Sequence, residues 1–198
     1  GGLGGYLANT LTVSNSTNTG SISGGSYVGG LGGYVEGATT VSNSTNSGAV
    51  TGLLYTGGVA GKINNTVSLT GFTNSGNITG TNYLAGGFGY STGTATLNNV
   101  TNSGTINNTS SNPYTAGLAG YVGGNFNVTN SSNTGNITGK SYTGGLGGFI
   151  NLDTFLTNVS NTGNVIGTTQ TGGFIGLTCG AFTLYNAPTS FMSGNVTG

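Results

Sequence analysis

Ionisable side chains are almost missing from this chain. Its 198 residues include two of Lys and Arg together, two of Asp and Glu together, and no His. Nucleic-acid binding needs a basic patch that neutralises phosphates, so the composition excludes nucleic acid as a partner. General acid–base catalysis needs His or paired carboxylates, so we do not expect an enzyme. A single Cys forms no disulfide framework and leaves a zinc or iron site without ligands, so no metal or cofactor is expected.

Long apolar runs are missing as well. No stretch reaches the roughly 18 apolar residues that a membrane-spanning helix needs, so no membrane span is expected. The chain opens on Gly1-Gly2 without a charged and then apolar leader, which indicates a mature protein or a segment of a longer one. Hydrophobic residues still make up 33% of the chain. Because they are regularly placed, disorder is disfavoured.

What the sequence does contain is an internal repeat that covers the whole chain. A Gly-Gly or Ala-Gly pair followed by an apolar residue returns every 28 to 30 residues. An Asn-Ser/Thr-Gly triplet, such as Asn46-Ser47-Gly48, returns in phase with that pair. The two anchors predict a single repeat domain, 1–198, made of seven units: 1–28, 29–56, 57–85, 86–115, 116–143, 144–171 and 172–198.

Three columns of the repeat hold an apolar residue in every unit. They are Leu3, Leu31, Val59, Phe88, Leu118, Leu146 and Phe174; Val13, Val41, Leu69, Leu97, Val128, Leu156 and Leu184; and Ile22, Val50, Ile78, Ile106, Ile137, Val165 and Val196. Small or polar residues flank the third column, which is the period-2 pattern of a half-buried strand. We therefore predict an all-β fold, a β-solenoid (parallel β-helix) of about seven 28-residue rungs with three short strands per rung. Residues expected in its core include Leu31, Val41, Val50, Ile78, Ile106 and Ile137.

Local signals refine this prediction. The Asn-Ser/Thr-Gly triplet is expected to form a corner, because Asn and Gly tolerate a left-handed backbone. Unit four carries the clearest insertion, around 107–113, and the irregular stretch 186–191 with Pro188 is expected to bulge the last unit.

Two stretches, 20–34 (GSISGGSYVGGLGGY) and 135–149 (GNITGKSYTGGLGGF), resemble the GLUG repeat of bacterial surface adhesins and extracellular proteins. The resemblance covers essentially all seven units, although the last unit fits poorly. It implies an extracellular or cell-surface β-solenoid that forms a stalk or an adhesive region. It implies no catalytic residue.

Asn-x-Ser/Thr sequons, the acceptor motif of N-linked glycans, occur twelve times. Asn77, Asn127, Asn136 and Asn195 each precede a column residue and are expected to point outward. Asn64, Asn107 and Asn108 complete the candidate glycosylation set. Strict alternation would instead point four other sequon residues inward as a stacked amide ladder, unless a corner there reverses their direction: Asn15, Asn43, Asn130 and Asn158.

Aromatic residues form two rows along the repeat. The first is Tyr27, Tyr55, Tyr83, Tyr114 and Tyr142; the second, partial row is Tyr6, Tyr34, Tyr121 and Phe149. A structural stack along neighbouring rungs is favoured over a platform for sugars. Glu36 and Lys62 are interpreted as a surface ion pair. The lone Cys179 is interpreted as a small buried hydrophobe.

Two functions fit these observations. The first is a structural component of an extracellular fibre, appendage or surface stalk, which assembles with copies of itself by head-to-tail stacking of uncapped solenoid ends. The second is an adhesin module that binds glycans or a surface. We expect either that the two solenoid ends pair with further copies or that the chain is cut from a longer array. N-linked sugar would keep nearly uncharged rods apart.

Overall fold

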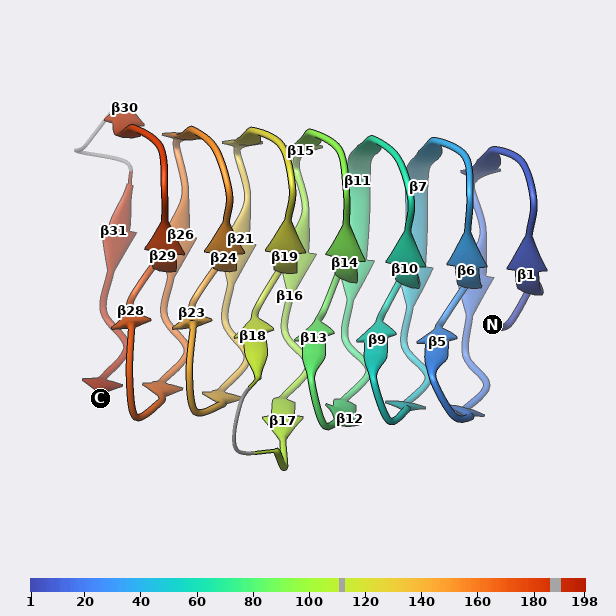
Figure 1. Cartoon of the computed structure of the whole chain (residues 1–198), viewed down its shortest axis with the longest axis horizontal. Coiled ribbons are helices and arrows are strands. Elements are labelled where there is room, and N and C mark those ends of the chain that lie inside the picture. The colour runs from blue at the N-terminus through green and yellow to red at the C-terminus, as the bar shows by residue number, and fades with distance from the viewer. Residues whose placement is uncertain (111–112, 186–189) are drawn as a thin grey trace.

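The computed structural model describes residues 1–110, 113–185 and 190–198. None of these residues is helical, and every strand pairing is parallel. The chain winds as a β-solenoid of about seven turns of about 28 residues, so that strands of successive turns lie side by side (Figure 1). The predicted fold class is confirmed.

Each full turn contributes to four sheets rather than to the three that the apolar columns predicted. Sheet A contains β1 (Gly4–Leu7), β6 (Gly32–Val35), β10 (Ala60–Ile63), β14 (Phe88–Ser91), β19 (Ala119–Val122), β24 (Gly147–Ile150) and β29 (Ile175–Thr178). Sheet B contains β2 (Leu11–Ser14), β3 (Thr17–Asn18), β7 (Thr39–Asn46), β11 (Val67–Asn74), β15 (Ala95–Asn98), β16 (Thr101–Asn102), β20 (Phe126–Thr129), β21 (Ser132–Asn133), β25 (Thr154–Thr157), β26 (Ser160–Asn161), β30 (Phe182–Tyr185) and β31 (Phe191–Met192).

The remaining strands complete the turn. Sheet C contains β4 (Ile22–Ser23), β8 (Val50–Thr51), β12 (Ile78–Gly80), β17 (Ile106–Asn108), β22 (Ile137–Thr138), β27 (Val165–Ile166) and β32 (Val196–Thr197). Sheet D, the unexpected one, contains β5 (Tyr27–Gly29), β9 (Tyr55–Gly57), β13 (Tyr83–Ala85), β18 (Tyr114–Ala116), β23 (Thr143–Gly144) and β28 (Thr171–Gly172). Its middle residue changes between apolar and polar, as in Val28, Thr56 and Leu84, so no apolar column revealed it.

The strand register locates the insertions. Ile78 pairs with Ile106, 28 residues on, whereas Tyr83 pairs with Tyr114, 31 residues on. Because Gly80 still pairs with Asn108, the three extra residues of this turn fall between Asn108 and Tyr114. Part of that insertion, 111–112, and most of the expected bulge, 186–189 with Pro188, lie outside the described residues.

One predicted column is wrong in its fourth unit. Phe88 pairs with Ala60 and Ala119, not with Val59 and Leu118. Correspondingly, Ala85 rather than Gly86 takes the place of Gly57, so the boundary predicted at 86 is one residue late. Where the residue next to a Gly-Gly pair is also small, the unit can be aligned one residue earlier or later, and the sequence alone does not distinguish the two alignments.

The second and third columns run in register through all seven turns. The residues expected in the core are buried. They are Leu31 of the first column, Val41 of the second, and Val50, Ile78, Ile106 and Ile137 of the third. The buried apolar side chains form two clusters, a larger one that includes residues of sheets A and B and a smaller one that includes residues of sheets C and D. No single turn could bury these faces, so stacking makes the core.

A buried amide ladder runs along the boundary between the two clusters. Each Asn side chain except the last donates from Nδ2 to Oδ1 of its counterpart on the next turn, always at 2.7 Å. Its members are Asn18, Asn46, Asn74, Asn102, Asn133 and Asn161. Each also donates to the carbonyl oxygen of the glycine two residues on, so these buried polar atoms are satisfied.

Glycine makes room for this ladder in two places. A β-carbon on Gly30, or on its counterparts, would fall on the amide of a ladder asparagine, here Asn46. A β-carbon on Gly76 would fall on the carbonyl oxygen of Gly48 one turn earlier. The Gly-Gly and Asn-Ser/Thr-Gly anchors therefore recur together because the residues of one pack against those of the other.

The triplet lies at a corner, as predicted: Asn46-Ser47-Gly48 joins β7 of sheet B to β8 of sheet C. Its backbone is not left-handed, however, since no residue of the triplet has positive φ; the left-handed column is Asn15, Asn43, Gly71, Asn99, Asn130 and Asn158, with φ between 45° and 64°. This conformation turns the asparagine side chains outward, and all five are exposed. The inward ladder considered for Asn15, Asn43, Asn130 and Asn158 is therefore wrong, although Asn158 Nδ2 donates to Asn130 Oδ1 at 2.7 Å on the surface.

Candidate functional site

Two adjacent strands of each turn carry the aromatic rows outward. The first residue of the sheet D strands β5, β9, β13 and β18 is tyrosine, and the third residue of the four-residue sheet A strands is usually aromatic. We call these rings together the aromatic belt: Tyr6, Tyr27, Tyr34, Tyr55, Tyr83, Tyr90, Tyr114, Tyr121, Tyr142 and Phe149.

The belt is packed as a herringbone. Within the sheet D row neighbouring rings are nearly parallel, with centroids 4.7 Å apart for Tyr55–Tyr83 and 4.6 Å apart for Tyr83–Tyr114. Between the rows most rings meet edge to face, as for Tyr83 and Tyr90 at 88°, whereas Tyr27 and Tyr34 stack at 23°. Such pairs are favourable arrangements of the ring quadrupoles. Because the rings largely cover one another's faces, the favoured interpretation of a structural stack describes most of the belt.

Sequence reasoning missed two members of the sheet A row. Tyr90 pairs with Tyr121, and Lys62 pairs with both Tyr34 and Tyr90, so Lys62 occupies a tyrosine position. The one-residue slip at Phe88 hid Tyr90. Counting from the first residue of each sheet A strand would have found both residues.

Lys62 is half-buried among rings. Its Nζ lies 5.0 Å from the centroid of Tyr34 and 5.7 to 5.9 Å from those of three further tyrosines, Tyr27, Tyr55 and Tyr90. These are cation–π contacts. Within the described chain the structure records no ion pair between Lys62 and Glu36, so the predicted ion pair is replaced by contacts with tyrosines.

Glu36, directly after β6, gathers hydrogen bonds beside the lysine. Its Oε1 accepts from the Tyr6 hydroxyl at 3.4 Å, and its Oε2 accepts from Asn64 Nδ2 at 3.1 Å. The hydrogen bond from the Tyr34 hydroxyl holds the pKa of the Glu36 carboxyl below its usual value. The same bond, with burial, raises the pKa of Tyr34 to about 12.

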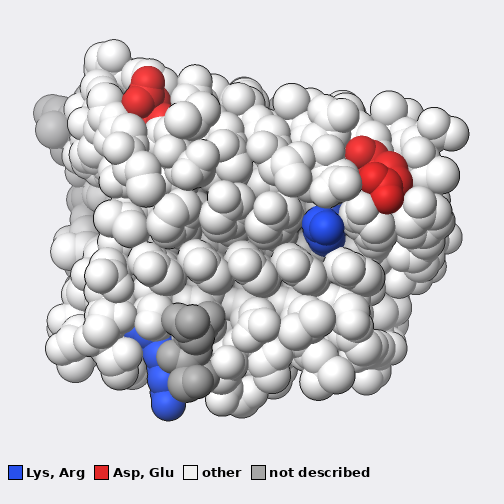
Figure 2. Space-filling view, in the orientation of Figure 1, with Lys and Arg blue, Asp and Glu red and all other residues white. Residues whose placement is uncertain are grey.

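We call the group Tyr6, Tyr34, Glu36, Lys62 and Asn64 the charged patch. It comes from three consecutive turns and contains two of the four charged side chains of the chain. Figure 2 shows its acidic and basic atoms close together on one face, whereas the other two charged groups, Lys140 and Asp153, lie apart from it. It is the clearest chemical departure from the repeat.

The candidate glycosylation residues differ in exposure. Asn64, Asn77, Asn107, Asn136 and Asn195 are exposed, and Asn127 is half-buried. Asn108 is 4% exposed, and its Nδ2 donates to the Asn82 carbonyl and to Thr115 Oγ1. A glycan cannot reach that atom, so the inclusion of Asn108 is wrong: the third residue of β17 points inward by strand alternation.

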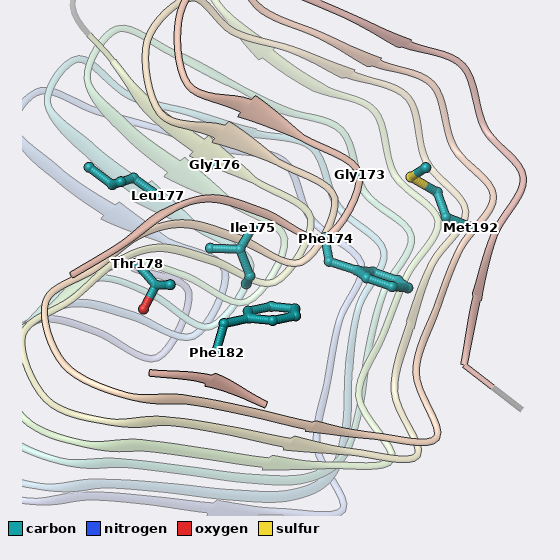
Figure 3. A pocket seen from close by; sticks show the side chains of 8 residues that line it. All are labelled: Gly173, Phe174, Ile175, Gly176, Leu177, Thr178, Phe182 and Met192. Atoms are coloured by element: carbon teal, nitrogen blue, oxygen red, sulfur yellow. The ribbon is translucent and has the colours of Figure 1, made fainter. Parts of the chain in front are cut away.

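The last turn exposes part of the apolar interior. A recess of about 450 Å³ lies there, and Phe174, Ile175 and Phe182 are among the residues that line it (Figure 3). Met192 replaces the ladder asparagine in this turn. Cys179 is exposed, so its interpretation as a buried hydrophobe is wrong.

Other kinds of site are sparse in the part of the chain that the structure describes. Over residues 1–110, 113–185 and 190–198 no three His, Cys, Asp or Glu side chains come together as metal ligands. No described helix is of a length and hydropathy that could span a membrane.

The GLUG motif matches residues 24–51 and residues 111–138. These segments end at the second residue of β8 and of β22, Thr51 and Thr138, which occupy equivalent positions three turns apart. Both matches therefore end at the same position of a solenoid turn. No curated protein and no solved structure matches the chain.

Proposed function

The chain is a GLUG-motif β-solenoid, and from this premise we propose that it is a structural component of an extracellular fibre, appendage or surface stalk. Copies join head to tail through their solenoid ends. The role is non-enzymatic and needs no cofactor, and the partners are further copies and N-linked glycans.

The observation that carries the proposal is the pairing of one turn with the next, which repeats in register through all four sheets of the described chain. Strands of the first and last described turns lie at the edges of these sheets, and an edge strand can pair with a further strand. Apolar columns that are buried in the middle emerge there: Leu69 is 0% exposed, whereas Leu3 is 64% and Val196 38% exposed. A second copy in the same register would pair the edges and cover the columns.

Electron microscopy of the purified chain tests the assembly. Wild-type protein is expected to form unbranched filaments whose thickness is that of one solenoid. Val196→Asp, which places a charge on the inward side of the terminal strand β32, should abolish filaments and leave folded monomers. The matched control is Thr197→Asp on the outward side of the same strand. Wild-type rods that stay monomeric at high concentration, or that join only through their sides, would refute head-to-tail assembly.

Glycosylation is proposed at Asn77, Asn107, Asn136 and Asn195, with Asn127 less accessible; Asn64 is left out because its Nδ2 donates to Glu36 Oε2 at 3.1 Å. The zero net charge supports glycosylation, because rods without net charge tend to associate and a hydrated sugar coat separates them. Glycopeptide mass spectrometry on native material should find sugar at these residues and an unmodified Asn108. Unmodified asparagine at every exposed site would contradict the proposal.

A second candidate function is an adhesin module that binds glycans. The charged patch favours it, because a binding site on a repetitive rod requires a local departure from the repeat. On this view the stalk would also carry a recognition surface.

A further inference from the structure

We propose that the charged patch, formed by Tyr6, Tyr34, Glu36, Lys62 and Asn64, is a binding site for neutral carbohydrate. This rests on the second candidate function and deepens it, since it names the residues and the ligand class. Because a copy joined head to tail would lie against the first turn, which contains Tyr6 in β1, the site is tested on the unassembled chain.

The geometry brings complementary polar groups to one place. Glu36 offers two carboxylate oxygens, and Asn64 Nδ2 and the Tyr6 hydroxyl already converge on them at 3.1 and 3.4 Å. Lys62 Nζ lies 5.0 Å from the ring centroid of Tyr34, which precedes Glu36 by two residues. Acceptors and donors therefore stand side by side on adjacent turns, as recognition of neighbouring sugar hydroxyls requires.

The rings supply the other half of such a site. Tyr6 is 61% exposed and meets Tyr34 edge to face with centroids 5.4 Å apart. An exposed ring at the edge of a polar cluster can receive the C–H face of a pyranose, while the cluster binds its hydroxyls. Elsewhere in the belt the parallel rings cover one another's faces, so the same platform is not offered.

The charge of the patch selects the ligand. Glu36 and Lys62 carry opposite signs, so the patch offers neither the cationic surface that anionic polymers need nor an acidic surface for cations. The rest of the chain adds only Lys140 and Asp153. A neutral, polyhydroxylated ligand fits this balance.

The belt contains its own control. At its other end Tyr114, Tyr121, Tyr142 and Phe149 pack with parallel rings within each row and edge-to-face contacts between the rows. In that part of the belt the sheet A row has no charged side chain in place of a ring. If rings alone bound sugar, both ends would bind equally.

The test is NMR titration of the whole chain with cellohexaose, chitohexaose, maltohexaose, xylohexaose, mannohexaose and a sulfated hexasaccharide. At least one neutral probe is expected to bind with a Kd between about 10 µM and 5 mM, with shifts centred on the charged patch. Glu36→Gln, which keeps the shape of the side chain, and Tyr6→Ala should each weaken binding about tenfold or more. Asp153→Asn and Tyr142→Ala are the matched controls and should leave the affinity unchanged.

Several results would overturn the inference. They are binding by none of the neutral probes, binding by the sulfated probe alone, or affinities of Glu36→Gln and Tyr6→Ala equal to wild type. Unchanged circular dichroism of each variant shows that it folds. Filament formation is scored on the same samples, so that loss of sugar binding with intact filaments is distinguished from failure of the assembly proposal.

Discussion

Replacing Asn102 by Ala tests whether the amide ladder holds the solenoid together. Asn102 Nδ2 donates to Asn133 Oδ1 at 2.7 Å and to the Gly104 carbonyl at 2.9 Å, and its Oδ1 accepts from Asn74 at 2.7 Å. The substitution removes three hydrogen bonds, each with a net contribution of about 1 kcal/mol. It also leaves partners unpaired in a buried site, at about 1–3 kcal/mol each. Because the penalty for an unpaired partner replaces the net contribution of its bond rather than adding to it, three partners give a total loss of about 3–9 kcal/mol.

Urea denaturation followed by circular dichroism measures this loss. The matched control is Asn107→Ala, because Asn107 is an exposed asparagine in the same turn. Its substitution should change the free energy of unfolding by no more than about 0.5 kcal/mol. If both variants unfold at the same urea concentration, the ladder contributes nothing that surface asparagines do not. The reasoning from buried amides would then fail.

Three further predictions follow from other features. Gly76→Ala should prevent folding or lower the free energy of unfolding by more than about 3 kcal/mol, because its β-carbon would collide with the carbonyl one turn earlier. The control Gly25→Ala, with no atom within 4 Å of its β-carbon, should leave stability nearly unchanged. Equal thermal midpoints of the two variants would contradict this. Because the pKa of Tyr34 is raised from 10.0 to about 12, its contribution to stability is present below pH 10 and is lost as the pH rises through 12. Phenolate absorbance should rise together with unfolding between these two pH values. A free energy of unfolding that stays constant between them would be the contrary result. Met192→Asn should restore an acceptor for Asn161 and extend the ladder across a junction, so filaments should form at lower protein concentration than wild type; an unchanged threshold in sedimentation would argue against end-to-end contact.

The sequence was sufficient to predict the solenoid because two columns are apolar in every unit. Sheet D escaped prediction because its inward residue alternates between Val28, Thr56 and Leu84, which no hydrophobic pattern detects. The ladder was assigned to the wrong asparagines because left-handed residues such as Asn43 break the alternation. The Gly-Gly pair and the Asn-Ser/Thr-Gly triplet recur together, and that joint recurrence was the available signal that the triplet asparagines form the ladder.

The candidate site was only partly visible in the sequence. Rows of tyrosine were evident, and Glu36 and Lys62 were recognised as neighbours. Two features depend on the strand register to within one residue. Lys62 occupies a tyrosine position, and Asn64 and Tyr6 converge on Glu36. A repeat whose glycines can slide by one position does not fix that register.

The amide ladder also gives the rod an electrical direction. In each of the five bonds between ladder asparagines the N–H points toward the following turn and the C=O points back, so the amide dipoles add as peptide dipoles do along a helix. Like ends brought face to face would set these dipoles in opposition, which disfavours a two-fold symmetric dimer joined through its ends. A polymer built from such rods is polar, and its two tips, being chemically different, should elongate at different rates.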